Sequence, residues 1–265
     1  MLTGLDERDP EHVLFHNARR LGHVPQASVR PYRASDLDDL YRICLQTGDV
    51  GEDATSMFDD PQILGHVFAA PYALFEPSLA FVAEDEVGVG GYIVGTLDSR
   101  AFEERLEANW WPALRDRYCA PPSELPPDQW TPDQRAAGLV HVPPTVPDEL
   151  AGEYPSHLHL NLVPRLQSQG LGRQLMNTLI RALREQGSAG VHFFVWPANQ
   201  RAISFYRHLG FTMISADGPV IFAMDLRPAR LGYLSTCGPI RRSASCKARS
   251  HPACHQSGLT DPNAA

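Results

Sequence analysis

A short glycine-containing turn near residue 170 is the first segment whose residue types could bind an anion. It reads Gln167-Ser168-Gln169-Gly170-Leu171-Gly172, directly after a predicted strand at 157–163, and it opens a predicted helix at about 170–186. Glycine lets the backbone approach a ligand closely. The first N–H groups of a helix have no partner within the helix, so they can bind a negative group such as a diphosphate. Alone, this pattern also occurs in turns that merely close tightly.

Two common nucleotide-binding patterns are absent at this turn. The dinucleotide fingerprint requires further glycines where Gln167 and Arg173 stand, and the phosphate loop that ends in Gly-Lys-Ser/Thr does not occur here. The turn therefore favours a diphosphate ligand of another kind.

A second segment follows the predicted strand at 191–195 and carries a polar cap and a tyrosine. It reads Asn199-x-x-Ala202-x-x-Phe205-Tyr206-x-x-x-Gly210-Phe211. Asn199 can cap a helix at 199–209, and Ala202, Phe205 and Leu209 form its buried stripe. Tyr206 lies beside that stripe and can direct its hydroxyl toward the preceding strand.

Together the two segments resemble the two cofactor motifs of the GNAT N-acetyltransferases, and the pair is far more specific than either half. The resemblance implies a GNAT fold, acetyl-coenzyme A as co-substrate and no metal. It also implies that an amine attacks the thioester directly once the two are aligned, without a covalent enzyme intermediate.

A second resemblance covers most of residues 29–226. The segments that carry it are Phe81-Val82-Ala83-Glu84-Asp85, Gly91-Tyr92-Ile93-Val94-Gly95-Thr96, Trp110-Trp111-Pro112 and Tyr154-Pro155-Ser156. They resemble the acetyltransferase-like C-terminal domain of metazoan O-GlcNAcase, and the chain is similar to the free-standing bacterial relatives of that domain. The metazoan domain has lost much of the phosphate loop, whereas this chain keeps Gln167, Gly170 and Gly172. No segment resembles the glycoside hydrolase part.

The GNAT resemblance assigns cofactor roles to residues of both segments. The N–H groups from Gln167 to Arg173 would hold the diphosphate, and the strand edge at Leu162 and Val163 would pair with the pantetheine arm. The cofactor-binding residues so implied are Leu162, Val163, Gln167, Gln169, Gly170, Leu171, Gly172, Arg173, Asn199, Phe205 and Tyr206.

The same resemblance implies two catalytic groups. The N–H near Leu162 would polarise the thioester carbonyl and stabilise the oxyanion. Tyr206 would protonate the departing thiolate. The alternative for Tyr206 is a packing residue whose hydroxyl is satisfied by a hydrogen bond.

The proton acceptor is less well defined. His157, His159 and Asn161 alternate along one strand and therefore share a face. In similar proteins an acid commonly stands at the position of Asn161, and asparagine cannot accept a proton at neutral pH. A histidine such as His159 could serve, or could be an ordinary buried, hydrogen-bonded histidine. The asparagine also motivates an alternative function, a non-catalytic acyl-coenzyme A-binding or protein-interaction module.

Several residues are candidates for contact with an acceptor. Asp98, Glu52 and Asp53 border the side where an acceptor enters in such folds, and Trp110 could line the same cleft. Since adjacent helical residues point about 100° apart, we expect one of Trp110 and Trp111 to be core.

The net charge of −8 combines an acidic body with a basic end. Residues 1–226 carry a net charge of −13 and residues 227–265 a net charge of +5. An acidic body argues against nucleic acid as a partner. It is compatible with a cationic acceptor, a small-molecule or peptide amine, although acidity also simply aids solubility.

The predicted order of elements is strand, two helices, a hairpin, an insertion, strand–helix–strand–helix and two strands. This order indicates an α/β fold with a mixed central sheet and helices on both faces. The predicted domains are an N-terminal extension at 1–27, the acetyltransferase domain at 28–226 and a basic, disordered tail at 227–265. A proline-rich insertion is expected at about 99–155, between the third and fourth strands. Residues 99–118 have helical periodicity through Phe102, Leu106, Trp110 and Leu114, and the prolines from Pro112 to Pro155 predict an irregular stretch.

Targeting and metal signals are weak. No run of about 20 apolar residues predicts a membrane helix, and the start of the chain lacks the apolar block of a signal peptide, so we expect a cytoplasmic protein. The spacing of Cys246, His251, Cys254 and His255 matches no common zinc pattern. Nothing in the sequence sets the oligomeric state.

Overall fold

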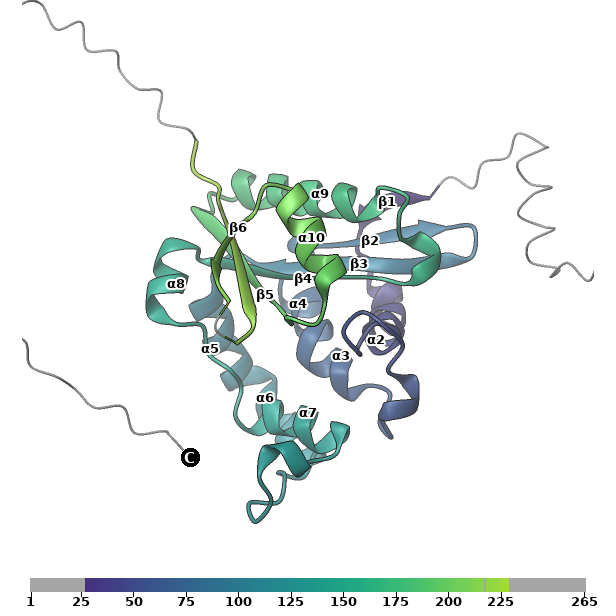
Figure 1. The fold of residues 1–265 in the computed structure, drawn as a ribbon, viewed down its shortest axis with the longest axis vertical. Coiled ribbons are helices and arrows are strands. Elements are labelled where there is room, and N and C mark those ends of the chain that lie inside the picture. The colour runs from purple at the N-terminus through teal and green to yellow at the C-terminus, as the bar shows by residue number, and fades with distance from the viewer. Residues whose placement is uncertain (1–26, 217, 229–265) are drawn as a thin grey trace, which may run out of the picture. The chain divides into compact units, whose positions relative to one another are not determined.

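The sheet organises the molecule (Figure 1). The structure, a computed structural model, describes residues 27–216 and 218–228. Its seven strands lie in the order β1-β2-β3-β4-β5-β7-β6. Their bounds are β1 Ser28–Pro31, β2 Ala80–Asp85, β3 Gly88–Thr96, β4 Ser156–Leu162, β5 Gly190–Val195, β6 Thr212–Ser215 and β7 Val220–Asp225. Strands β4 and β5 are parallel and every other neighbouring pair is antiparallel. The predicted mixed sheet is confirmed.

Strands β4 and β5 separate almost as soon as they meet. They pair only at Ser156 with Val191 and at His157 with His192, although β4 continues to Leu162. On its other side β4 pairs with β3 from His157 to Leu162. The second half of β4 therefore has one main-chain edge that no neighbouring strand covers, and this open edge faces the gap between β4 and β5.

One face of the sheet is covered by two helices, α9 (Leu171–Glu185) and α10 (Gln200–His208). Leu171, Leu175, Leu179 and Leu183 of α9 are buried, as their spacing of four residues predicts for one helical stripe. They pack with the even-numbered leucines of β4 and the odd-numbered residues of β5. These contacts set both helices against the two strands that separate.

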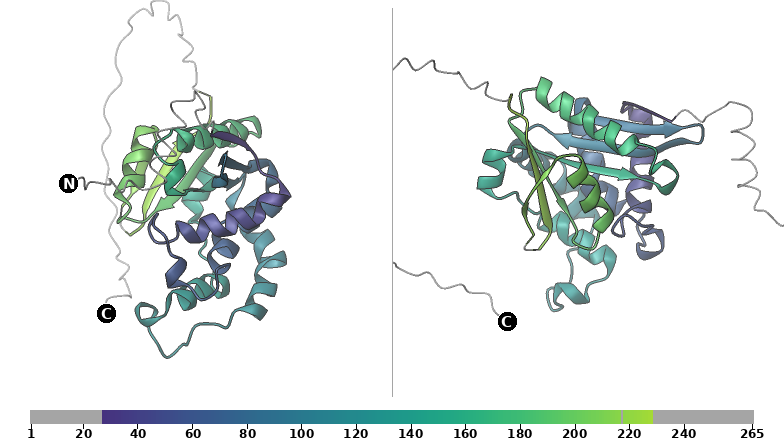
Figure 2. Two further views of the ribbon diagram at one scale, coloured as in Figure 1. Left: turned by 90° about the vertical axis from the view of Figure 1, so that its right-hand side faces the viewer. Right: turned by 45° about the horizontal axis from the view of Figure 1, so that its top comes forward.

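The opposite face is covered by the helices that precede β2 and by those of the insertion (Figure 2). Their bounds are α2 Leu37–Gln46, α3 Ile63–Phe68, α4 Ala70–Phe75, α5 Ser99–Asn109, α6 Trp111–Arg117, α7 Pro132–His141 and α8 Asp148–Glu153. Short 3-10 turns lie at η1 Ala34–Asp36, η2 Thr55–Met57, η3 Pro77–Leu79, η4 Pro127–Gln129 and η5 Pro164–Leu166.

The insertion between β3 and β4 is more regular than its prolines suggest. Proline is tolerated in the first turn of a helix, where its missing N–H has no partner to lose. Pro132 begins α7, and Thr131 and Gln134 form a reciprocal capping box there. Pro112 lies near the start of α6. The helical conformation is interrupted at Trp110, which ends α5 and precedes α6. The expectation of an irregular segment is therefore wrong for α7 and α8, whereas the helical periodicity expected at 99–118 agrees with α5 and α6.

Two features shape the helices that precede β2. The carboxylate of Asp36, just before α2, accepts the Arg33 N–H at 2.8 Å and pairs with Arg30. The segment after the loop forms two short helices, α3 and α4, separated at Ala69.

The remaining regional expectations fall largely outside the described part of the chain. The extension at 1–26 and the tail from 229 onward are not described. Within the described residues, no helix combines the length and the apolar character required to cross a membrane.

Gly95 tests how tightly β4 is held between β3 and α9. A β-carbon at Gly95 would lie 2.9 Å from the His157 carbonyl oxygen and 3.2 Å from Leu179. We expect Gly95→Ala to lower the free energy of unfolding by about 1–3 kcal/mol, because backbone cannot move aside cheaply. Urea unfolding measures this. Gly152→Ala in α8 is the control, since nothing lies within 4 Å there, and it should leave stability equal or slightly higher.

Candidate active site

The turn between β4 and α9 exposes a row of main-chain N–H groups. Gly170 is the N-cap of α9, with φ +80° and no side-chain cap. Ser168 also has a positive φ, +60°. The N–H groups of residues 168–173 make no hydrogen bond within the described part of the chain. Unpartnered N–H groups at a helix start are the arrangement that the sequence predicts here, and we call these six groups the amide cradle.

Two glutamine side chains hold the turn of the amide cradle by hydrogen bonds to main-chain carbonyl oxygens that precede it. Gln167 donates from Nε2 to the Leu162 carbonyl oxygen at 2.7 Å, and Gln169 donates to the Arg165 carbonyl oxygen at 2.6 Å. The Gln167 N–H is itself bonded to the Pro164 carbonyl oxygen at 3.1 Å. The predicted set of free N–H groups therefore begins at Ser168, and Gln167 shapes the turn.

The two glycines of the cradle serve different purposes. A β-carbon on Gly170 would meet nothing within 4 Å, so the space above it is open. A β-carbon on Gly172 would lie 3.1 Å from the Phe205 ring and 3.2 Å from Leu162. Gly172 thus lets α9, α10 and β4 meet closely, and Phe205 packs beneath the cradle.

Arg201 adds positive charge beside the cradle. It lies on α10, and its guanidinium donates to the Ser168 hydroxyl at 3.4 Å. No sequence pattern singled out this residue, because it stands between motif positions. Its placement comes only from α10 lying next to the turn, and it favours an anionic ligand there.

The open edge of β4 begins where β5 turns away. Because the Val163 N–H bonds to the Gly90 carbonyl oxygen at 2.9 Å and the pattern alternates along an antiparallel pair, the N–H groups of Leu160 and Leu162 point away from β3. The predicted role of the Leu162 N–H is compatible with this geometry. Val163 is different, since its N–H is held by Gly90 and its carbonyl oxygen by Leu166. The open edge consists of Leu160 and Leu162.

Asn199 caps α10 and keeps a free donor. Its Oδ1 accepts the Ala202 N–H at 3.0 Å, as predicted from its position. Its Nδ2 makes no hydrogen bond within residues 27–216 and 218–228, and it lies 3.3 Å from the position that a β-carbon on Gly51 would take. The loop after α2 therefore reaches the start of α10.

Tyr206 is buried in an aromatic cluster but its hydroxyl remains unbonded. Its ring lies 4.4 Å from that of Phe193 and 5.8 Å from that of Phe222, centroid to centroid. The hydroxyl has no hydrogen-bond partner in the described residues, and it is not among the fully enclosed side-chain oxygens that lack one. Burial raises the pKa of this phenol. The phenol therefore carries its proton at neutral pH, which a proton donor requires.

Two histidines of β4 share a hydrogen-bonded tyrosine. The Tyr72 hydroxyl lies 2.8 Å from His157 Nε2 and 3.2 Å from His159 Nε2. Burial lowers the pKa of His157 well below its usual value and that of His159 to about 4. Both imidazoles are therefore neutral at physiological pH.

Asn161 is a brace between the sheet and α2. Its Nδ2 donates to the Thr47 hydroxyl at 2.5 Å, and that hydroxyl donates to the Ile43 carbonyl oxygen at 2.8 Å. An amide cannot take up a proton at neutral pH, so the geometry gives Asn161 a structural part.

The predicted acceptor residues lie on two separate loops. Asp53 accepts from the N–H and hydroxyl of Thr55, and Asp98 caps α5 through Ala101. The main chains of Glu52 and Asp49 pair in a tight turn in which Val50 has a φ of +55°. Positive φ is strained for a β-branched residue. The same turn places Gly51 beside Asn199.

The two neighbouring tryptophans both pack into the helical layer. Trp111 is buried, and Trp110 is partly buried with its indole N–H donating to the His66 carbonyl oxygen at 2.9 Å. The Trp110 ring packs edge-on against Phe75 and His66. The expectation that one of the pair is core is met by Trp111, and Trp110 is largely committed to packing.

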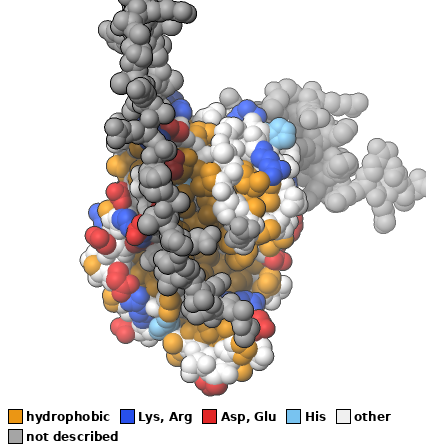
Figure 3. Space-filling model, turned by 60° about the vertical axis from the view of Figure 1, so that its left-hand side comes forward, with side chains coloured by type: hydrophobic (Ala, Val, Ile, Leu, Met, Phe, Trp, Pro, Cys, Tyr) orange, Lys and Arg blue, Asp and Glu red, His pale blue; other side chains and the backbone are white. Residues whose placement is uncertain are grey.

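The face that carries His157 and His159 also carries exposed aromatic residues of β5 and its end. Phe194 is 49% exposed and Trp196 is 67% exposed. The Phe194 ring lies 5.8 Å from that of His192. Figure 3 shows hydrophobic side chains gathered around a hollow on one face of the molecule.

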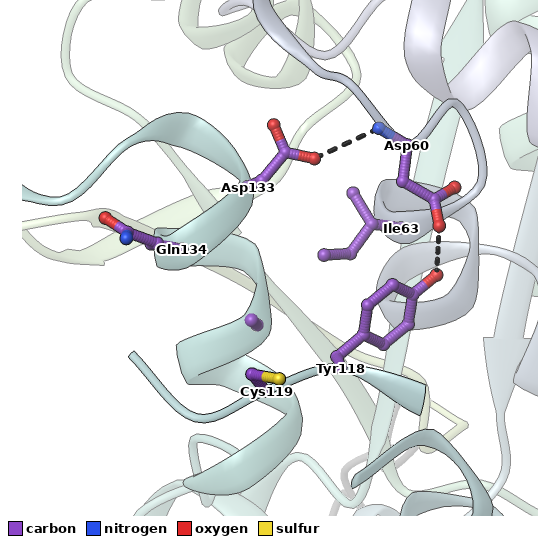
Figure 4. Close-up of a pocket in the computed structure, with 7 residues that line it drawn as sticks. Asp60, Ile63, Tyr118, Cys119, Asp133 and Gln134 are labelled. Atoms are coloured by element: carbon purple, nitrogen blue, oxygen red, sulfur yellow. Dashed lines mark hydrogen bonds between the residues drawn. The ribbon is translucent and has the colours of Figure 1, made fainter. Parts of the chain in front are cut away.

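A separate pocket lies among α3, α6 and α7 (Figure 4). Its lining residues are Asp60, Ile63, Tyr118, Cys119, Asp133, Gln134 and Ala137. Its two carboxylates are already bonded, Asp133 to the N–H groups of Asp59 and Asp60, and Asp60 to Tyr118 and Arg117. None of its residues belongs to the sheet, and it is not part of the site at β4. In the described residues, no three His, Cys, Asp or Glu side chains are grouped as a metal would need.

Comparison with known proteins places this geometry in a family. The model of the acetyltransferase (GNAT) family matches residues 37–211. The chain therefore belongs to the acetyltransferase (GNAT) family.

Individual relatives agree with this assignment. The chain is 24% identical over 184 residues to protein O-GlcNAcase of Rattus norvegicus and to that of Mus musculus, an overlap of 69% of this chain. It spans about one fifth of the length of these relatives, 20% in each case. The crystal structure of SsHAT has a TM-score of 0.71 and 39% identity, covering 77% of this chain and 100% of that one. Another acetyltransferase structure, with 15% identity and a TM-score of 0.50 over 76% of this chain and 100% of that one, shares the fold.

Burial of neutral histidines predicts how stability depends on pH. Burial lowers the pKa values of His66, His157, His159 and His192 in the folded state, whereas an unfolded chain takes up a proton on each near pH 6.5. Stability should be full above about pH 7 and fall by about 2–4 kcal/mol by pH 5, before the carboxylates titrate. Urea unfolding at the two pH values measures it. His159→Gln should make the loss smaller, and a stability independent of pH over this range would contradict the burial of neutral rings.

Proposed function

We propose that the chain transfers an acetyl group from acetyl-coenzyme A to an amine of a small molecule or peptide. The observation that carries this proposal is the joining of the open edge of β4 to the amide cradle by a single turn. The open edge of β4 suits an extended chain that carries amides, and the amide cradle suits an anion. Coenzyme A has both features in one molecule, a pantetheine arm and a diphosphate.

The residues present fit that co-substrate. The Leu160 and Leu162 N–H groups are free to pair with the amide-bearing arm, and Nδ2 of Asn199 is a further donor across the gap. The N–H groups of residues 168–173 would hold the diphosphate, with Arg201 beside them. The open space above Gly170 leaves room for it.

The chain's own residues would then divide the chemistry. The Leu162 N–H would orient and polarise the thioester carbonyl, because a fixed donor stabilises charge that develops on that oxygen. Tyr206 would give its proton to the leaving sulfur. Glu52, Asp53 and Asp98 would attract a cationic acceptor, in keeping with the acidic body of the protein.

A second candidate is a non-catalytic module that binds acyl-coenzyme A. The hydrogen bond from Asn161 to Thr47 favours it, because the position where similar proteins carry an acid is committed to structure. Incubation with isotopically labelled acetyl-coenzyme A and a metabolite extract separates the two. A labelled amide detected by mass spectrometry supports transfer. Tight binding without any labelled product supports the module.

Gly170 and Gly187 provide a matched test of the amide cradle. Both have left-handed backbone, with φ of +80° and +83°, and neither has an atom within 4 Å of an added β-carbon. They stand at opposite ends of α9. Each Gly→Ala change should cost about 1 kcal/mol of stability. Only Gly170→Ala should weaken coenzyme A binding, by about tenfold, since its methyl group enters the cradle. Calorimetry measures both, and equal affinities would remove the cradle from the site.

The role of Tyr206 predicts a split between turnover and binding. Tyr206→Phe should lower kcat by about 10- to 100-fold, because the proton donor is lost, while the KM for acetyl-coenzyme A changes little. Steady-state kinetics measure both. Tyr32→Phe is the control, since it likewise removes a hydroxyl that has no partner in the described residues, but Tyr32 lies after β1, near the opposite edge of the sheet. An unchanged kcat in Tyr206→Phe would rule out the donor role.

A further inference from the structure

Four side chains form a continuous line of hydrogen bonds from a main-chain carbonyl to β4. Ser99 Oγ lies 2.7 Å from the Pro155 carbonyl oxygen and 2.7 Å from His157 Nδ1. His157 Nε2 lies 2.8 Å from the Tyr72 hydroxyl, which lies 3.2 Å from His159 Nε2. The line joins α4, α5 and β4, and we call it the Ser99 chain.

The carbonyl at its end fixes the direction of the first two bonds. A carbonyl oxygen can only accept, so the one hydroxyl proton of Ser99 goes to Pro155. Ser99 is fully buried, at 0% exposure, and no water competes for that proton. The Ser99 oxygen must then accept from His157, which places a proton on His157 Nδ1.

The next two bonds follow from the first. Because burial keeps His157 neutral, its Nε2 carries a lone pair and accepts the Tyr72 proton. Tyr72 has no second proton, so its oxygen accepts from His159 Nε2–H. His159 is therefore the Nε2–H tautomer, and its Nδ1 is left with a free lone pair.

His159 lies on the part of β4 whose edge is open. His159 stands on β4 beyond the last residue paired with β5, next to Leu160. Its ring packs against Phe68 at 5.5 Å and is partly exposed. Its Nδ1 makes no hydrogen bond in the described part of the chain.

The other two histidines of this face are not available. Both ring nitrogens of His157 are used by Ser99 and Tyr72. His192 donates from Nδ1 to the Tyr154 carbonyl oxygen at 2.7 Å, and its unpartnered Nε2 is enclosed, with the residue at 0% exposure. Only His159 combines a free lone pair with partial exposure.

We propose that His159 Nδ1 accepts the proton of the attacking amine, and that Tyr72, His157 and Ser99 are positioning residues that keep this nitrogen unprotonated and correctly turned. This inference rests on the proposed acetyl transfer. It assigns the base to a tautomer set by residues far apart in the sequence.

The proton balance is complete. The amine nitrogen forms a bond to the acetyl carbon as the carbon–sulfur bond breaks. One amine proton passes to His159 Nδ1, and the proton of Tyr206 passes to the sulfur. Solvent takes the proton from His159 and returns one to Tyr206. The products are the amide and the free thiol, with both side chains restored.

The tautomers are tested on the unmodified protein by nitrogen-15 NMR of the histidine rings. We expect His157 as the Nδ1–H form and His159 as the Nε2–H form at neutral pH. Tyr72→Phe should leave His157 unchanged and make His159 a mixture of both forms. A charged His159, or a His159 protonated on Nδ1, would overturn the inference without any measurement of activity.

The base role is tested by kinetics on the amine found to be acetylated. His159→Gln keeps an N–H that can reach Tyr72 but cannot accept a proton, so kcat should fall about 100-fold with KM within about threefold. Tyr72→Phe should lower kcat about tenfold. His208→Gln on α10 is the control and should change neither.

If the wild type transfers acetyl groups and His159→Gln keeps the same kcat, the inference is overturned and the proposed function stands. A wild type that transfers nothing would overturn both, and the NMR result would still show whether the Ser99 chain exists.

Discussion

The structure depends on β4 losing its neighbour after His157. A strand with an unpaired edge normally costs hydrogen bonds or invites aggregation, yet here the edge lies in the middle of the sheet. It is held open from both faces, by α9 and α10 packed on the leucines of β4 and by the helices on the opposite side. The Asn161–Thr47 and Gln167–Leu162 bonds hold the last two residues of β4. The amide cradle, the free N–H groups of Leu160 and Leu162, and His159 all owe their positions to this separation of two strands.

Local patterns in the sequence predicted the parts of this site that local structure creates. A helix N-terminus with a left-handed glycine, a capping asparagine and a stripe of leucines each depend on residues within a few positions, so Gly170, Asn199 and α9 could be placed correctly. The main-chain partners of Val163 could not be predicted in this way. Which N–H groups of a strand point outward depends on its register with β3, and one residue of register reverses every assignment. In the insertion, prolines were interpreted as breaks although Pro132 begins a helix.

The Ser99 chain lay beyond the reach of sequence analysis for a related reason. Tyr72 and His157 are 85 residues apart, and Ser99 and His157 are 58 apart. The alternation of His157 and His159 showed that they share a face, but not which of their nitrogens is free. That distinction comes from a buried serine, whose single proton is claimed by a carbonyl. Arg201 was likewise unrecognised, because only the packing of α10 brings it to Ser168.

The central claim is that one molecule spans the open edge of β4 and the start of α9. Residue-resolved amide hydrogen exchange with and without acetyl-coenzyme A tests it most directly, since it reports on the main-chain donors themselves. The account predicts that the amides of Leu160, Leu162 and Gly170 to Arg173 become protected together when the co-substrate is added, while exposed amides of α7 do not change. Exchange at these donors that is the same with and without acetyl-coenzyme A would contradict it.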